Sequence, residues 1–144
     1  MLRFGEELLE RIRAHAVQSY PYECCGALLG ADESGGRQIR DLVPLDNQRH
    51  DSARNRFLVN PGDVRRVEAA ARERGLEVVG WYHSHPDAPE RPSDFDREHA
   101  WPWYSYVIVS VEAAEPRRMA AWRLAEDRAR FEPEEIVTEW SASG

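Results

Sequence analysis

Apolar residues in the N-terminal part of the chain recur with the spacing of a helix. Within residues 6–19 they are Leu8, Leu9, Ile12 and Ala16. Charged residues lie between them, so this range predicts an amphipathic helix. We expect the helix to end at Tyr20, because a residue that precedes proline disfavours the helical region.

Short apolar runs in the rest of the chain have the length and composition of strands. Small and apolar residues over 24–30 predict a buried strand. A turn is expected over 32–36, and further strands over 38–45, 56–59, 76–82, 105–111, 119–124 and 131–137. The polar range 46–55 is typical of a loop, and the last residues, 141–144, should fray.

Two more helices are expected among these strands. The segment 60–63, Asn-Pro-Gly-Asp, is a helix-start signal, and Gly75 is a natural stop. A shorter helix begins at Ser93 and runs to about Ala100. The element order predicts an α/β fold with a mixed, mostly antiparallel central sheet flanked by helices. With 144 residues, the chain is expected to form a single domain over 1–144.

Composition and charge narrow the function classes. The net charge of −7 gives a nucleic-acid partner no electrostatic support, so none is expected. All 19 basic residues are arginine, which excludes Schiff-base chemistry at a lysine. No apolar run is long enough to cross a bilayer, and the N-terminus lacks the apolar core of a signal peptide. We therefore expect a cytoplasmic protein without a membrane partner, in which Cys24 and Cys25 are reduced thiols.

The candidate chemistry lies in His83-Ser84-His85, with Asp96 eleven residues after the second histidine. If the strand over 76–82 continues, His83 and His85 point to the same side of it. Two neutral imidazoles and one carboxylate are the three-ligand set of a catalytic zinc site with its fourth position open to water. The spacing alone leaves ordinary hydrogen-bonded histidines as an alternative. That interpretation is favoured for the other histidines: His15, His50 and His99.

Two further residues have both a structural and a chemical interpretation. Ser93 and Asp96 form the Ser-x-x-Asp pattern of a capping box, and a carboxylate bound to a metal would be less free to form it. Glu23 lies sixty residues before His83, so only the fold can bring the two together. A surface glutamate is one interpretation of Glu23. Its place before a buried strand favours the other, a carboxylate suited to acid/base chemistry.

Together, these residues resemble the JAMM (MPN-plus) family of zinc metallopeptidases, in its prokaryotic single-domain branch. The family signature is an upstream Glu, then His-x-His, ten residues and Asp, with Ser three residues before that Asp. The matching residues are Glu23, His83, His85, Ser93 and Asp96. The segment 23–30 is also similar to the Glu-x-Cys-Gly-x-Leu-x-Gly segment of the prokaryotic branch.

The resemblance implies a JAMM/MPN fold of cytidine-deaminase-like architecture and a role for each residue. His83, His85 and Asp96 would bind Zn²⁺, and Glu23 would be the general base. Ser93 would help to hold the oxyanion, which leaves its roles as helix cap and oxyanion donor in competition. Two neutral ligands and one carboxylate leave a net positive centre that lowers the pKa of bound water to roughly 7.

The resemblance also implies a substrate class. Members of the family cut peptide or isopeptide bonds after the Gly-Gly tail of ubiquitin-like or sulfur-carrier proteins, and such a tail could add as a strand at a sheet edge. The alternative is a non-catalytic MPN-type scaffold that binds other proteins, although scaffolds of this kind lack the ligand set. A zinc deaminase is set aside, because its His-x-Glu and Pro-Cys-x-x-Cys signature is absent.

Two groups near the candidate site have a structural interpretation that we favour. Cys24 and Cys25 adjoin Glu23 and could approach the metal, but burial in the core is more typical of free cysteine. An aromatic group follows the short helix: Trp101, Trp103, Tyr104 and Tyr106. Core packing is favoured for this group, with a platform for an extended substrate as the alternative.

Overall fold

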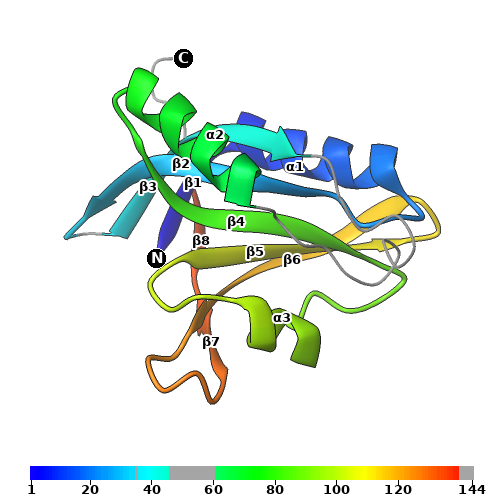
Figure 1. Ribbon diagram of the computed structural model, residues 1–144. Helices are drawn as coiled ribbons and strands as arrows, with labels where there is room; N and C mark the ends of the chain where they lie inside the picture. Colours follow the sequence, from blue (N-terminus) through cyan, green and yellow to red (C-terminus); the bar gives the residue numbers. More distant parts are fainter. Residues whose placement is uncertain (35, 46–60, 140–144) are drawn as a thin grey trace.

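The computed structural model describes residues 1–34, 36–45 and 61–139, and its core is one mixed sheet (Figure 1). The strands are β1 (Leu2–Gly5), β2 (Cys25–Glu33), β3 (Gly36–Leu45), β4 (Glu77–Pro86), β5 (Ser105–Glu112), β6 (Glu115–Leu124), β7 (Phe131–Glu134) and β8 (Ile136–Glu139). The helices are α1 (Glu6–Ser19), α2 (Pro61–Glu73) and α3 (Asp94–His99). None of these helices is long and apolar enough to span a membrane.

The strand order in the sheet is β7-β6-β5-β4-β2-β3-β1-β8. Four of the pairings are antiparallel: β2 with β3, β2 with β4, β5 with β6 and β6 with β7. The pairings of β1 with β3, β1 with β8 and β4 with β5 are parallel. The predicted α/β fold with a mixed, mostly antiparallel sheet is therefore confirmed. That residues 1–144 form a single domain stays a prediction.

The helices α1 and α2 cover opposite faces of the sheet. Neighbouring residues of β2 show this, because Leu28 packs in one apolar cluster and Leu29 in another. The cluster around Leu28 contains Ile12 of α1, whereas the cluster around Leu29 contains Val67 of α2. Side chains alternate between the faces of a strand, so each helix buries its apolar stripe against one face.

A β-bulge in β4 decides which side chains of that strand face α2. Leu28 pairs with Gly80 and Leu29 with Val78, so Val79 is an extra residue in β4. A Cβ atom at Gly80 would lie 2.1 Å from the carbonyl oxygen of Ser105 on β5, so only glycine fits this close approach. The bulge reverses the alternation: Val78 and Trp81, three residues apart, pack in the same cluster. The residues beyond it that share the face of Trp81 are His83 and His85.

The C-terminal strand prediction was wrong in an informative way. The range 131–137 was expected to be one strand, but it contains β7 and the start of β8, which lie at opposite edges of the sheet. Only Glu135 separates them, and the backbone N–H of Leu2 in β1 donates to the carbonyl oxygen of Glu135 at 2.7 Å. The two edges of the sheet therefore lie close together, which means that the sheet curls back on itself.

Some of the other predicted helix and strand boundaries agree with the structure, and others differ from it because of strand pairing. The helix over 6–19 is confirmed, and the helix expected from 60 to 75 is present as α2. The turn predicted over 32–36 was too long, because Asp32 and Glu33 still belong to β2 and Gly36 already belongs to β3. Strand β4 continues through Pro86 since β5 pairs with it to that point, and β1 was not predicted. The loop over 46–55, the strand over 56–59 and the frayed end 141–144 lie outside the described residues.

Candidate metal centre

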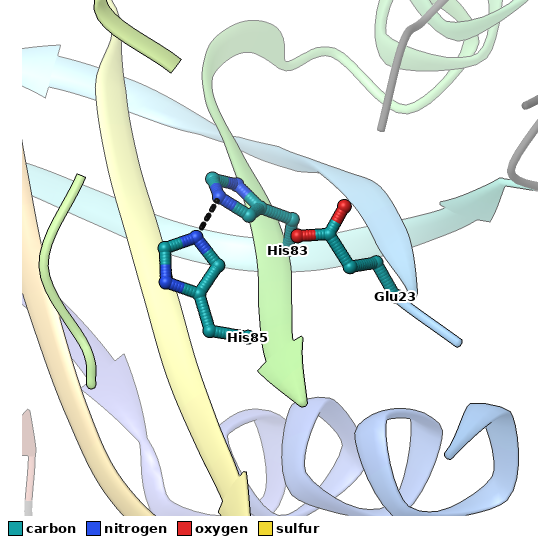
Figure 2. Close-up of side chains that lie close together, drawn as sticks. All are labelled: Glu23, His83 and His85. Atoms are coloured by element: carbon teal, nitrogen blue, oxygen red, sulfur yellow. Dashed lines mark hydrogen bonds between the residues drawn. The ribbon is translucent and has the colours of Figure 1, made fainter. Parts of the chain in front are cut away.

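His83 and His85 lie on β4, at the centre of the sheet between β2 and β5. Both side chains are buried, with 1% of His83 and 7% of His85 exposed. Their Nε2 atoms face each other at 3.1 Å (Figure 2). The strand thus places both imidazoles on the same face, as the spacing of the sequence indicates.

Asp96 completes a triangle of donor atoms from the first turn of α3. Its Oδ2 atom lies 3.3 Å from Nε2 of His83 and 3.2 Å from Nε2 of His85. Ser93 fixes this position, because Ser93 and Asp96 form a capping box at the start of α3. The carboxylate is therefore held against β4 by a helix end, although it comes from a different element.

The spacing of the triangle fits a small tetrahedral metal ion. Ligand atoms about 2.0–2.1 Å from a tetrahedral zinc ion lie about 3.3–3.4 Å from one another. The three separations here are 3.1, 3.2 and 3.3 Å. Two imidazole nitrogens and a carboxylate oxygen are also a donor set that zinc accepts. The residues present therefore fit the metal that the sequence predicts.

A hydrogen bond fixes the tautomer of His85. Its Nδ1 atom lies 2.8 Å from the carbonyl oxygen of Pro89. A carbonyl can only accept, so Nδ1 carries the proton and donates it. In the neutral ring, Nε2 then presents its lone pair to the centre of the triangle. Sequence reasoning missed this role of Pro89, since a backbone carbonyl leaves no signal in the sequence.

The protonation states of the triangle also suit a cation. Burial lowers the pKa of His83, and the nearby Asp96 opposes this only in part, so the ring is neutral at pH 7. Burial on its own would raise the pKa of Asp96. Interactions with His83 and His85 and the hydrogen bond from the Ser93 backbone outweigh it and hold the pKa well below its usual range. The site therefore offers the lone pair of a neutral His83 and the negative charge of Asp96.

Glu23 reaches the same site from the segment before β2. The antiparallel register pairs Cys25 with His83, and continuing it by two residues brings Glu23 level with His85. One ligand atom from each of Glu23, His83 and His85 lies within 4.8 Å of the others, and Figure 2 shows these side chains together. Only 3% of Glu23 is exposed. Burial raises the pKa of Glu23 to about 9, and the charge of Asp96 adds to this shift.

The sequence of the chain matches one protein-family model over most of its length. Residues 5–125 match the model described as prokaryotic homologs of the JAB domain. The chain belongs to this family. The resemblance to the prokaryotic branch of the JAMM (MPN-plus) family is therefore confirmed, and with it the expectation of a JAMM-type peptidase.

Three curated relatives of this JAB-domain chain carry peptidase names. A desampylase of Haloferax volcanii is 33% identical over 74% of this chain and 76% of the relative. A TtuB-protein conjugate cleaving protease of Thermus thermophilus is 32% identical over 73% of this chain and 67% of the relative. A CysO-cysteine peptidase of Mycobacterium tuberculosis is 26% identical over 93% of this chain and 90% of the relative.

Solved structures agree with the JAB-domain fold. A protein from Salinibacter ruber is 42% identical, with a TM-score of 0.77 over 99% of this chain and 94% of that one. A JAB1/MPN domain protein from Archaeoglobus fulgidus is 20% identical, with a TM-score of 0.59 over 96% of this chain and 95% of that one. The second match shows the fold alone.

Ser93 caps α3 in the JAB domain and keeps a donor for another use. The backbone N–H of Asp96 donates to Oγ of Ser93 at 3.1 Å. That bond uses a lone pair of the hydroxyl oxygen and leaves its O–H group to donate elsewhere. The cap and the oxyanion role are therefore compatible, and the oxyanion role stays a prediction.

Both cysteines are buried and neither is in a disulfide, as expected of core residues. Cys25 shares the face of His83, and its thiol lies 3.8 Å from the carbonyl oxygen of Leu45. Cys24 packs in the cluster on the α1 side, with its backbone N–H donating to Ser84 Oγ at 2.8 Å. Within the described ranges, the cluster that could hold a metal contains neither cysteine.

The remaining histidines have the ordinary hydrogen bonds expected of them, where the structure describes them. His15 Nδ1 lies 2.8 Å from the Tyr82 hydroxyl, and His99 Nδ1 lies 2.9 Å from the carbonyl oxygen of Phe95. His50 lies outside the described residues. Among the histidines of the described residues, only His83 and His85 belong to the cluster that could hold a metal, and His15 and His99 do not.

The aromatic group after α3 divides into two kinds of residue. Tyr106 is buried in the core, as predicted. Core packing was the wrong expectation for the two tryptophans, because Trp101 is 66% exposed and Trp103 is 43% exposed. Both line a cavity of about 880 Å³ that also includes His83 and Asp96 in its lining.

Proposed function

We propose that this chain is a zinc-dependent peptidase that cuts a peptide or isopeptide bond at the C-terminal Gly-Gly tail of a ubiquitin-like or sulfur-carrier protein. The observation that carries the proposal is the triangle of His83, His85 and Asp96 with Glu23 beside it. The names of the three relatives, which refer to desampylation, to a TtuB conjugate and to CysO-cysteine, support this class of substrate.

In this proposal, His83, His85 and Asp96 hold the zinc ion. When bound, zinc acts as a Lewis acid that lowers the pKa of a water molecule to about 7 and polarises the carbonyl group under attack. Pro89 orients one ligand through His85, and Ser93 orients another through Asp96. The hydroxyl of Ser93 donates to the oxyanion that develops on the substrate carbonyl.

Glu23 is the proton carrier. Its carboxylate takes a proton from the attacking water and later passes it to the nitrogen of the leaving amine. Burial favours this role, because a carboxyl group with a raised pKa is a stronger base once it is ionised. Such a base contributes about 10²–10⁴-fold to the rate of hydrolysis.

Two donor sets compete for the metal, and the distances favour one of them. Glu23 also lies within 4.8 Å of both histidines and could replace Asp96 as the third ligand. Asp96 is closer, at 3.2 and 3.3 Å from the two Nε2 atoms, and its pKa is held low. Glu23 has a raised pKa, which favours a group that exchanges protons.

The arrangement argues against two other expectations. A metal-free scaffold does not need an intact set of His83, His85 and Asp96, so the non-catalytic alternative is less well supported. At His83, β4 is paired with β2 on one side and with β5 on the other, so this position offers no sheet edge to which a substrate tail could add. We also propose a reducing, cytoplasmic location, which fits two cysteines that are not joined in a disulfide.

The test is cleavage of a sulfur-carrier protein that ends in Gly-Gly followed by one further residue, with the mass change measured by mass spectrometry. We expect the extra residue to be removed by the zinc-loaded protein and retained after treatment with a chelator. A carrier whose tail is changed to Ala-Ala is the control for tail recognition. If carriers with cysteine, lysine or peptide extensions all keep their mass, the proposed function is wrong.

A further inference from the structure

A cavity of about 880 Å³ lies beside the candidate metal centre. Seven of its lining residues are aromatic: Trp81, Phe95, Trp101, Trp103, Tyr104, Tyr106 and Phe131. Val64 and Arg65 of α2 line it as well, and so do His83 and Asp96 of the metal centre. We call this feature the aromatic cleft. Since metal-centre residues are part of its lining, whatever fills the cleft lies within reach of the bond that is cut.

The positions of Trp101 and Trp103 in the aromatic cleft are unfavourable for the stability of the fold. Large aromatic side chains are normally buried, yet Trp101 and Trp103 are 66% and 43% exposed. Trp103 also has a positive φ of 84°, in a region where a bulky residue is strained by about 1–3 kcal/mol. Exposed aromatic residues around a cavity are typical of binding sites.

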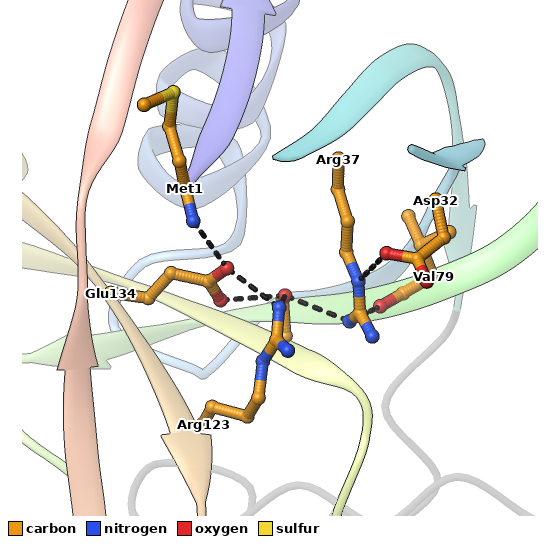
Figure 3. A network of polar contacts seen from close by, with 7 residues as sticks. Met1, Asp32, Arg37, Val79, Arg123 and Glu134 are labelled. Atoms are coloured by element: carbon orange, nitrogen blue, oxygen red, sulfur yellow. Dashed lines mark hydrogen bonds and ion pairs between the residues drawn. The ribbon is translucent and has the colours of Figure 1, made fainter. Parts of the chain in front are cut away.

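A buried arginine holds Trp103 in this position. The Arg37 guanidinium lies 4.1 Å from the centre of the Trp103 ring, although only 1% of Arg37 is exposed. Figure 3 shows its bonds to Asp32 at 3.0 Å and to the carbonyl oxygen of Val79 at 2.9 Å. The cleft wall therefore rests on a fixed cation rather than on a mobile surface side chain, so it is built before a ligand arrives.

The size and chemistry of the cleft limit what can occupy it. Cavities of about 300–1,000 Å³ enclose ligands of several side chains. A Gly-Gly tail has no side chains, so the residues immediately before the cut bond leave such a volume unfilled. A single lysine stem, as in an isopeptide, is also too small, and Arg65 disfavours a cationic segment. What remains is the polypeptide that follows the bond, with apolar side chains.

We infer that the aromatic cleft binds an apolar peptide on the leaving-group side of the bond, so the preferred substrate is a carrier with a linear, apolar C-terminal extension. This inference rests on the proposed function and adds to it a preference of the enzyme for one kind of leaving group. Bulky side chains of the extension pack against Trp101 and Val64, while the Gly-Gly tail lies on the other side of the bond. The enzyme then acts as a processing peptidase that exposes the Gly-Gly terminus.

The test compares extensions on one sulfur carrier that ends in Gly-Gly-Ala. One substrate continues with Leu, Phe and Trp, a second continues with Ser, Thr and Gln, and a third joins the Gly-Gly tail to a lysine side chain. We expect kcat/KM to be about tenfold higher or more for the apolar extension than for either of the others. Equal values for all three overturn the inference and leave the proposed function standing, whereas no cleavage of any substrate overturns both.

A cleft variant shows whether the preference comes from this surface. In Trp101→Ala, we expect the ratio of kcat/KM between the apolar and polar substrates to fall towards one, and in Trp101→Phe to recover. Trp101 is mostly exposed, so the substitution leaves the core intact. If Trp101→Ala lowers both rates by the same factor, Trp101 does not select the leaving group and the inference is wrong.

Discussion

Ser93 and Asp96 hold each other by two hydrogen bonds, and one of them uses the oxygen that faces the metal site. The backbone N–H of Ser93 donates to Oδ2 of Asp96 at 2.9 Å. The same Oδ2 lies 3.2 Å from Nε2 of His85. A carboxylate oxygen has two lone pairs, so one can accept the bond from the cap while the other is directed to a metal. Capping and metal binding at Asp96 therefore support each other, contrary to the expectation that they compete.

The two roles of Ser93 can be separated by substitution. Ser93→Ala removes both the cap oxygen and the hydroxyl donor, so we expect a loss of about 1 kcal/mol in the free energy of unfolding. Loss of an oxyanion donor lowers kcat by about 10²–10³. Thermal or chemical unfolding and steady-state cleavage of a Gly-Gly carrier measure the two effects.

Ser93→Gly is the matched control, because glycine at an N-cap costs only about a few tenths of a kcal/mol and carries no hydroxyl. We expect this variant to keep stability and to lose kcat as Ser93→Ala does. Recovery of kcat in the glycine variant would mean that Ser93 acts only as a cap.

The ligand assignment predicts metal loss in three variants. His83→Ala, His85→Ala and Asp96→Ala each remove one corner of the triangle, so we expect well below one zinc per chain in each after dialysis. His99→Ala is the control, since His99 lies on α3 with Asp96 but is not one of the three proposed ligands. We expect the His99→Ala variant to retain one zinc ion per chain, as measured by elemental mass spectrometry. Full occupancy in all three triangle variants would contradict the assignment.

Glu23 is expected to matter for turnover rather than for metal binding. Glu23→Gln keeps the shape of the side chain but cannot take a proton, so we expect zinc content near that of the native protein and a loss of about 10²–10⁴-fold in kcat. Zinc analysis and cleavage rates on one preparation check both parts. If zinc is lost instead, Glu23 is a ligand and the set of Glu23, His83 and His85 replaces the one proposed.

The parts of the site that are local in the chain could be predicted from the sequence. His83 and His85 are two residues apart on a strand, so alternation alone placed them on one face. Ser93 and Asp96 carried the capping pattern that the structure contains. The place of Glu23 before a buried strand favoured acid/base chemistry, but only the family signature linked it to His83, because pairing of β2 with β4 joins positions about sixty residues apart.

The parts that depend on packing between distant segments could not be predicted. One apolar run became β7 and the start of β8, and nothing in the run indicates that its two halves pair with opposite edges of the sheet. Trp101 and Trp103 belong to a residue type that is normally buried, so composition favoured the core. The position of Trp103 depends on Arg37 and on the positive φ of its own backbone, neither of which has a local signal.

Substitution of Gly80 tests whether the metal site depends on the bulge in β4. In Gly80→Ala, the added Cβ would meet the Ser105 carbonyl oxygen at 2.1 Å, so β4 and β5 must separate locally. We expect a loss of about 3 kcal/mol in the free energy of unfolding and weaker zinc binding, because His83 follows three residues later. Gly5→Ala is the control: a Cβ there meets nothing within 4 Å, and we expect a change below about 1 kcal/mol.

The contacts of Glu134 predict a pH-dependent contribution to stability where the two edges of the sheet meet. Its carboxylate accepts bonds from Arg123 at 2.7 Å, from the Ser105 hydroxyl at 2.7 Å and from the Met1 ammonium at 3.0 Å. Burial alone would raise the pKa of Glu134, but these partners outweigh it and lower the pKa below its ordinary value of 4.5. A lowered pKa in the folded state means stabilisation above pH 4.5 that is lost as the pH falls through the folded-state pKa.

Glu134→Gln should therefore lower the free energy of unfolding by about 1–3 kcal/mol at pH 7 and by less at pH 3. Urea unfolding of both proteins at the two pH values measures the difference. Glu132→Gln, also on β7, is the matched control, because its exposed ion pair with Arg130 at 3.7 Å contributes little. A gap between native and Glu134→Gln that is equal at pH 7 and pH 3 would show that the carboxylate acts through packing and not through its charge.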